Sequence, residues 1–205
     1  MAIISNAVTI ADAGAFSVNL GSQVLIKTLT ASSDSTLSFV NGSSNVVLDS
    51  TYPIYLFKFI NIHAQTNAKS LIVNFSDDTS SHSYNLTKTT TLFYAYHTES
   101  GSSSALAYLP NEDLAQSTAA AEIIIEIGNS NDDSGSGYMY LFNPSSTTFA
   151  KHFIARASVT QPSLAEDVHS TGYVNTTAAV TAVQFSMASG NIDSGTFKLY
   201  GIKDS

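Results

Sequence analysis

The sequence contains no cysteine among its 205 residues, and only 12% of its residues are charged. Without cysteine the chain can form no disulfide, offers no thiolate nucleophile and binds no metal through sulfur, and it suits assembly in a reducing cytoplasm. The low charged fraction leaves much of the surface to serine, threonine and asparagine. Such a surface favours extensive protein contacts, because few charges lose their water when another subunit binds.

Basic residues and long apolar runs are also scarce. Lys and Arg number 8 against 16 Asp and Glu, which gives a formal charge of −8, and the basic residues form no cluster that would capture a phosphate backbone. No run approaches the roughly 20 apolar residues that span a bilayer, and the first six residues, MAIISN, lack the basic start of a secretory signal. We therefore expect neither nucleic acid nor a membrane as a partner.

Alternation of apolar and polar residues dominates what is present. Hydrophobic residues make up 43% of the chain and include 11 Phe and 10 Tyr, enough to build a core. Period-two runs rich in β-branched and aromatic residues, separated by Gly, Asn, Asp and Ser turns, predict about a dozen strands. Clear examples are Gln23–Thr30, Thr36–Val40, Ser70–Phe75, Glu122–Ile127 and Thr196–Ile202.

The segment Ile54–Ile62 (IYLFKFINI) is apolar on both faces. In a regular strand Tyr55, Phe57 and Phe59 point one way, while Ile54, Leu56, Ile60 and Ile62 point the other way. Strands buried on both faces have this pattern. We predict that the segment lies in the centre of a sheet and is covered on both sides.

No proline-rich linker or internal repeat divides the chain, so we expect a single domain over residues 1–205. Asn111–Ala121 (NEDLAQSTAAA) is the one segment with helical features, namely a capping Asn and early carboxylates. The pattern otherwise predicts an all-β fold, an antiparallel two-sheet β-sandwich of the jelly-roll type, with a closed barrel as the alternative.

Metal-binding patterns are weak. Asp132 and Asp133 lie in a Gly/Ser/Asn loop and have the oxygen chemistry of a calcium site, but the spacing of a calcium loop is missing, and we interpret the loop as a solvated turn. The histidines form no HxH or HxxxH pair. They are His63, His82, His97, His152 and His169.

Catalytic patterns are equally weak, and we predict no catalytic, cofactor-binding or metal-binding residues and no enzyme activity. There is no GxSxG nucleophile motif. Carboxylates that a glycosidase would need are present, but no spacing selects a pair. They are Glu99, Glu112, Glu122, Glu126 and Glu166. Tyr94 and Tyr96 are suited to stacking on sugar rings or to burial against a partner, and half-buried strand positions explain them equally well.

Several segments resemble a family of virion structural proteins of marine tailed phages, including cyanophages. The similar segments cover most of residues 54–202, and the last of them is the most specific. They are Tyr55–Thr66, Lys88–Glu99, Asp113–Thr118, Tyr138–Phe153, Gly172–Ala178 and Phe185–Ile202. Within the last segment, we interpret Ser189–Gly195 (SGNIDSG) as a hairpin turn that closes the sheet.

The resemblance implies a virion protein assembled in the cytoplasm of a bacterial host. We expect a capsid decoration or cement subunit, or a tail-surface subunit, whose partners are other virion proteins and copies of itself in a homo-oligomer, a trimer by analogy. Residues 1–20 match the family less clearly and are a candidate attachment or strand-exchange segment. The alternative is a tail-fibre or receptor-binding module for a host glycan, which would show an exposed aromatic beside carboxylates or amides in a concave patch.

Overall fold

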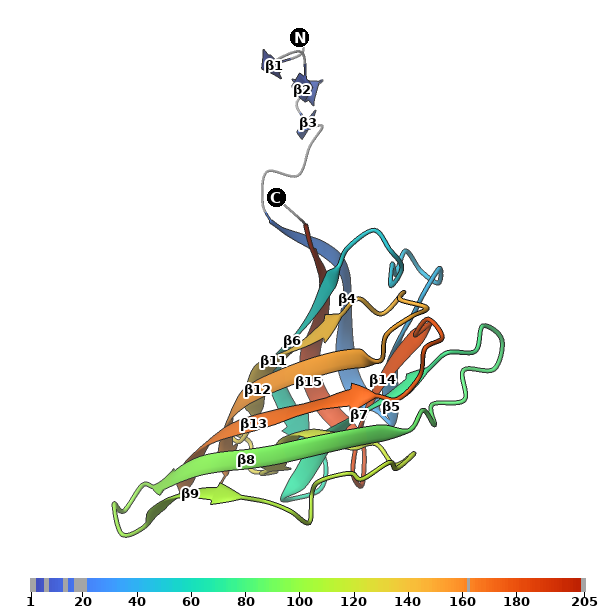
Figure 1. Ribbon diagram of the computed structural model, residues 1–205. Coiled ribbons are helices and arrows are strands. Elements are labelled where there is room, and N and C mark those ends of the chain that lie inside the picture. The colour runs from blue at the N-terminus through green and yellow to red at the C-terminus, as the bar shows by residue number, and fades with distance from the viewer. Residues whose placement is uncertain (1–2, 6–7, 13–14, 17–21, 162, 204–205) are drawn as a thin grey trace.

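The computed structural model describes residues 3–5, 8–12, 15–16, 22–161 and 163–203, and these residues form strands and no helix (Figure 1). The strands are β1 Ile3–Ser5, β2 Val8–Asp12, β3 Ala15–Phe16, β4 Gln23–Asp34, β5 Thr36–Val40, β6 Ile54–Ala64, β7 Lys69–Ser76, β8 Lys88–Thr98, β9 Ser104–Tyr108, β10 Ala121–Ile127, β11 Gly135–Phe142, β12 Lys151–Gln161, β13 Leu164–Val174, β14 Ala182–Met187 and β15 Ile192–Ile202. The prediction of an all-β fold is confirmed.

Two antiparallel sheets form the body of the protein, in the order β10-β7-β14-β5 and β4-β15-β6-β11-β12-β13-β8-β9. A jelly roll has eight strands, B to I, in two sheets of order B-I-D-G and C-H-E-F. Here β5 to β11 correspond to strands B to H, and β14 corresponds to strand I. The smaller sheet is then B-I-D-G (β5-β14-β7-β10), and the larger sheet contains C, H, E and F (β6, β11, β8 and β9). The β12–β13 hairpin is inserted between strands H and E, and β15 and β4 extend the second sheet beyond strand C. The chain is therefore a two-sheet sandwich of jelly-roll type.

The core fills the space between the two sheets, where aromatic rings from both sheets meet. Phe185 of β14 lies 5.2 to 5.6 Å, centroid to centroid, from the rings of Phe57, Phe59 and Phe197 on the larger sheet. Edge-to-face and tilted pairs at this spacing add to the free energy gained by burying the rings. This cluster joins the two layers at the centre of the sandwich.

Strand β6 is an interior strand of the larger sheet, as predicted, and Tyr55, Phe57 and Phe59 are buried in the core. The prediction for its other face was partly wrong. A bulge with positive φ at Asn61 shifts the register, so Ile62 turns into the core. Ile60 is 39% exposed, because no other sheet covers the outer face of this strand.

The helical features of Asn111–Ala121 produce no helix, because this segment runs along β8 and bonds to it. Thr90 N donates to the Leu114 carbonyl, Leu92 N donates to Asp113 Oδ1, and Lys88 and Ser117 form a β-bridge. These bonds satisfy backbone groups at the edge of the sheet, so tertiary pairing overrides the local helical features.

The interpretation of Ser189–Gly195 as a hairpin was also wrong. Strand β14 belongs to the smaller sheet and β15 to the larger one, so the turn carries the chain from one layer to the other. Gly190 and Gly195 both have positive φ. A Cβ at Gly195, near the start of β15, would also lie 2.9 Å from the Asn61 carbonyl oxygen, so glycine is required where β15 lies against the bulge of β6.

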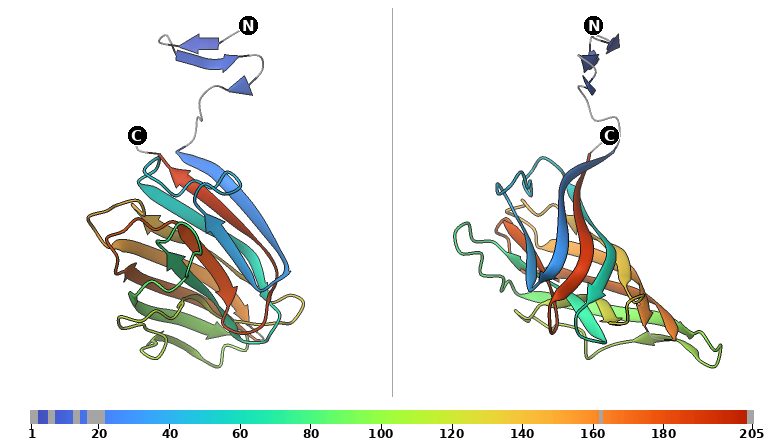
Figure 2. Two further views of the ribbon diagram at one scale, coloured as in Figure 1. Left: turned by 90° about the vertical axis from the view of Figure 1, so that its right-hand side faces the viewer. Right: turned by 180° about the vertical axis from the view of Figure 1, so that it is seen from behind.

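The N-terminal strands β1, β2 and β3 form a third sheet of their own, which pairs with neither sheet of the body. Figure 2 shows these strands beyond the end of the sandwich where β4 begins and β15 ends. At that end Lys203 N, just after β15, donates a hydrogen bond to the carbonyl of Ser22, just before β4. The candidate attachment segment is thus partly described, and no strand of it belongs to the sandwich.

Two lysines are fully buried where loops meet the strands. Lys88 Nζ donates to Asn74 Oδ1 and to the Leu86 carbonyl, each at 2.6 Å. Lys151 Nζ donates to the carbonyls of Phe149 and Thr176. Burial lowers the pKa of Lys88 to about 8, because the ammonium loses its water without gaining a carboxylate partner. Both lysines fix loop carbonyls to the strands.

Candidate functional site

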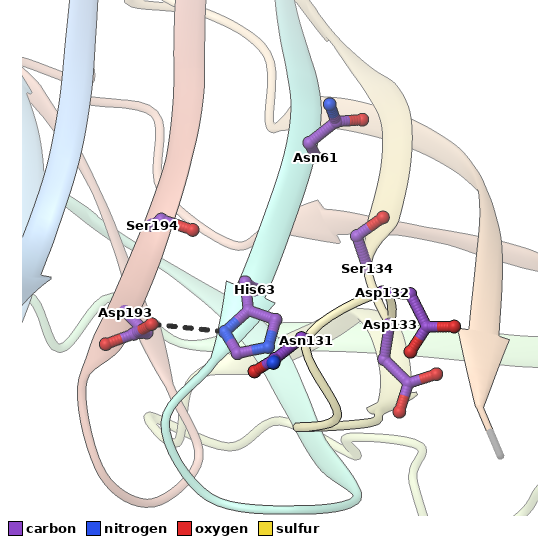
Figure 3. Close-up of a pocket in the computed structure, with 8 residues that line it drawn as sticks. All are labelled: Asn61, His63, Asn131, Asp132, Asp133, Ser134, Asp193 and Ser194. Atoms are coloured by element: carbon purple, nitrogen blue, oxygen red, sulfur yellow. Dashed lines mark hydrogen bonds and ion pairs between the residues drawn. The ribbon is translucent and has the colours of Figure 1, made fainter.

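A depression of about 430 Å3 lies where the ends of β6 and β15 meet the loop before β11 (Figure 3). His63 is its central side chain. His63 Nδ1 is 3.2 Å from Asp193 Oδ2, and Nε2 is 3.0 Å from the Ser130 carbonyl oxygen. Both neighbours are acceptors, so both contacts are hydrogen bonds only when each ring nitrogen carries a proton.

The carboxylates predicted as a possible calcium pair do not converge on a common point. Asp133 is buried, and its Oδ2 accepts a hydrogen bond from Ser130 N at 3.1 Å, which closes the turn. Asp132 is exposed, and in Figure 3 both side chains point away from His63. Among the described residues, no group of three or more His, Asp or Glu side chains is arranged to hold a metal ion.

The other histidines lie in separate surroundings. His169 stacks on Phe93 with ring centroids 4.8 Å apart and planes 5° apart, and His152 lies beside Tyr173. His82 packs near Tyr84, and its buried Nδ1 has no hydrogen-bond partner. His97 is exposed on β8. These contacts are those of packing and surface residues.

Four of the five glutamates singled out above come together at the open edge between the sheets. Glu112, Glu122 and Glu126 line a cleft of about 210 Å3 together with Lys69. Burial raises the pKa of Glu122, a hydrogen bond with Ser70 lowers it and the nearby charge of Glu112 raises it, with a net result of about 7. Glu122 is therefore half-buried at this edge.

Glu166 faces the same edge from the larger sheet. Gln161 Nε2 donates to Glu126 Oε2 at 2.9 Å and lies 3.5 Å from Glu166 Oε1, while Glu166 Oε2 has no partner. Burial raises the pKa of Glu166 to about 7, and the charge of Glu126 adds to the effect. Because Glu166 is only 4% exposed, a bulky substrate cannot reach it as a glycosidase mechanism requires.

Tyr94 and Tyr96 point toward the inner side of the larger sheet. Their rings stack at 5.8 Å, both are half-buried, and Tyr96 Oη is 3.0 Å from Ser103 Oγ. Burial and the charges of Glu166 and Glu126 raise the pKa of Tyr94. Both tyrosines are therefore half-buried strand residues, the second of the two interpretations given for them from the sequence.

The outer face of the larger sheet was not singled out by the sequence. Register brings Lys198, Lys58, Tyr138 and Arg156 into one row across β15, β6, β11 and β12. Tyr200, Leu56, Tyr140 and Ile154 form the next row. Each strand shows the alternation that places these side chains outward, but strand order, which no local pattern encodes, sets them side by side.

The two rows hold their charged groups in place. Arg156 binds Asp167 through two hydrogen bonds of 2.9 and 2.8 Å, and Lys58 Nζ lies 4.8 Å from the ring centroid of Tyr200. A bidentate pair and a cation–π contact both restrict side-chain rotation.

Among the described residues, no helix is both long and apolar enough to cross a bilayer. The chain matches no protein-family model, no curated protein and no solved structure.

Proposed function

We propose that the chain is a non-enzymatic structural protein of a tailed-phage virion, a decoration or cement subunit or a tail-surface subunit. It acts by binding other virion proteins and further copies of itself. The observation that carries this proposal is the edge strand β9.

Strand β9 ends the eight-stranded sheet, and among the described strands it pairs only with β8. It carries two of the three most exposed large apolar side chains of the described residues, Leu106 at 74% and Tyr108 at 59%. A free strand edge with large apolar side chains is a surface that proteins ordinarily blunt with charge or cover with a partner. No Lys, Arg, Asp or Glu occurs in β9 (SALAY), so this edge favours contact with another chain.

The segments that resemble phage virion proteins support the same proposal. Lys88–Glu99 contains β8, on which β9 lies, and Tyr138–Phe153 and Phe185–Ile202 supply β11, the start of β12 and β15. These strands build the larger sheet, so the resemblance covers the scaffold that presents the β9 edge. We propose a closed homo-oligomer, a trimer by analogy, because cyclic closure satisfies such an edge in every copy.

Co-sedimentation with purified particles of the virus that encodes the chain tests the proposal. Peptides of the chain should be found in the particles by mass spectrometry. Added wild-type chain should co-sediment with particles that lack it, and Leu106→Lys should reduce the bound fraction at least about tenfold, since it puts a charge into a dry contact.

Leu25→Lys is the matched control, because Leu25 is 52% exposed on β4 at the opposite edge of the same sheet. This variant should bind particles as wild type does. Absence of the chain from the particles, or equal binding by both variants and wild type, would remove the proposal.

A further inference from the structure

The middle of the outer face contains a shallow trough of about 640 Å3, separate from the β9 edge. Leu56, Gly137 and Ala157 contribute its apolar part, and polar side chains surround them. The polar lining residues are Lys58, Ser136, Tyr138, Arg156, Ser158 and Asp167. An apolar floor with a few polar groups around it, in this range of volume, is the usual form of a small-molecule or saccharide site.

The charge of this surface is opposite to that of the whole chain. Lys58 lies directly opposite Lys198 in the register of β6 and β15, and Arg156 lies one strand beyond Tyr138. Among the described residues neither lysine takes part in an ion pair, and the one carboxylate of the trough, Asp167, is already bound to Arg156. Lys58 in the trough and its neighbour Lys198 on β15, which is not among the lining residues, thus make this surface cationic in a protein whose formal charge is −8.

Two lysines directly opposite each other on neighbouring strands destabilise a sheet. An anion held between them would remove this repulsion, and Lys58 is already oriented by Gln23 Oε1 at 3.1 Å and by the ring of Tyr200. The pairing of like charges without a carboxylate partner therefore points to an anionic ligand that the isolated chain does not contain.

Aromatic rings stand beside these cations. Tyr138 is 36% exposed at the trough and packs edge-to-face on Tyr140, with centroids 5.4 Å apart. An exposed ring offers its face to the C–H groups of a sugar, and adjacent hydroxyls and a carboxylate can bind the sugar hydroxyls. Ser136, Ser158 and Asp167 supply those groups in the trough.

We propose that this trough binds an acidic saccharide. A sugar ring lies against Tyr138, its carboxylate or sulfate is held by Lys58 and Lys198, and Ser136, Ser158 and Asp167 bind its hydroxyls. A peptide or a second copy would need a broad dry contact, whereas the trough is concave and has polar groups around it, so the saccharide is the better fit. This site is independent of assembly through β9.

Calorimetric titration with polygalacturonate, dextran sulfate and neutral dextran tests this proposal. Wild type should bind at least one of the two anionic polymers and not dextran, and the two anionic arms distinguish a carboxylate from a sulfate ligand. Lys58→Gln combined with Lys198→Gln should weaken binding at least tenfold, and so should Tyr138→Ala. Lys27→Gln combined with Lys69→Gln changes the net charge equally at positions outside the trough, and should bind as wild type does.

Three results would overturn the proposal: no binding of either anionic polymer, equal loss in the Lys27/Lys69 control, or full binding by Tyr138→Ala. A change in oligomeric state caused by Tyr138→Ala, with saccharide binding unaffected, would assign the face to a second copy instead. Thermal melting of each variant checks folding, and the Lys58/Lys198 variant should melt no lower than wild type because a like-charge pair is removed. Co-sedimentation of these variants with particles separates the two proposals. If only the saccharide proposal fails, the variants still bind particles as wild type does.

Discussion

Leu106 on β9 lies directly opposite Ala95 on β8, and this pairing leaves Leu106 74% exposed. An alanine is too short to cover the leucine beside it, and none of the described strands lies on the other side of β9. The isolated chain therefore gains little from the leucine, whereas a partner that covered it would bury most of a large apolar side chain, worth about 1.5–3 kcal/mol.

We expect Leu106→Lys to change the free energy of unfolding by less than about 0.5 kcal/mol, because exposed positions contribute little to folding. Phe197→Ala should cost about 3–5 kcal/mol, because Phe197 is fully buried against Phe59 and Phe185. Urea denaturation of both variants measures the two values. A large destabilisation by Leu106→Lys would show that β9 supports the fold rather than a contact.

The buried glutamates predict a decrease in stability with rising pH. Glu122 and Glu166 ionise near 4.5 when unfolded and at about 7 when folded. Between these values the folded state holds protons that the unfolded state has released, so the contribution of these two groups to stability is greatest below about pH 4.5 and is lost as the pH rises to about 7. Glu166→Gln should reduce this slope and raise the melting temperature at pH 8 by a few degrees. Melting curves from pH 4.5 to 8 provide the measurement, and an unchanged slope in the variant would contradict the assignment.

Lys88 predicts the opposite trend in the alkaline range. Its ordinary pKa of 10.5 falls to about 8 in the fold, so between these values the unfolded state holds a proton that the folded state has lost. Stability should therefore contain a contribution that rises from about pH 8 to pH 10.5. Lys88→Met should remove this rise, as followed by denaturant midpoints across that range. Lys27→Met, at a half-buried position of β4, should leave the rise in place.

Deletion of residues 1–20 should leave the melting temperature of the body within about 2 °C of wild type, because no N-terminal strand pairs with either sheet of the sandwich. Attachment to particles should weaken, since the segment is then missing as an added contact. Calorimetry and co-sedimentation measure the two effects separately. Unchanged attachment by the shortened chain would exclude these residues as an anchor.

The strands were predictable because alternation is a local property, as Thr36–Val40 shows by matching β5 at both ends. Features that depend on the order of strands in a sheet could not be predicted from the sequence. The bulge at Asn61 reverses the side of Ile62, and the turn at Ser189–Gly195 joins two layers rather than two neighbours. No local pattern encodes either choice.

The candidate sites show the same limit. Glu126 and Glu166 were recognised as carboxylates from the sequence, but their approach through Gln161 depends on how β10 packs across β12 and β13. Lys58 and Lys198 are 140 residues apart in numbering and become neighbours only through the pairing of β6 with β15. The sequence identifies which side chains can ionise, but only the fold shows which of them lie next to each other.

Hydrogen–deuterium exchange of the chain, free and assembled in the particle, tests the central claim of contact through β9 most directly. Free β9 should exchange rapidly, because it is a short strand at the end of the sheet. In the particle, amides of residues 104–108 should exchange at least about tenfold more slowly as a neighbour covers Leu106 and Tyr108. Equal exchange of these amides in the free and assembled chain would contradict the account.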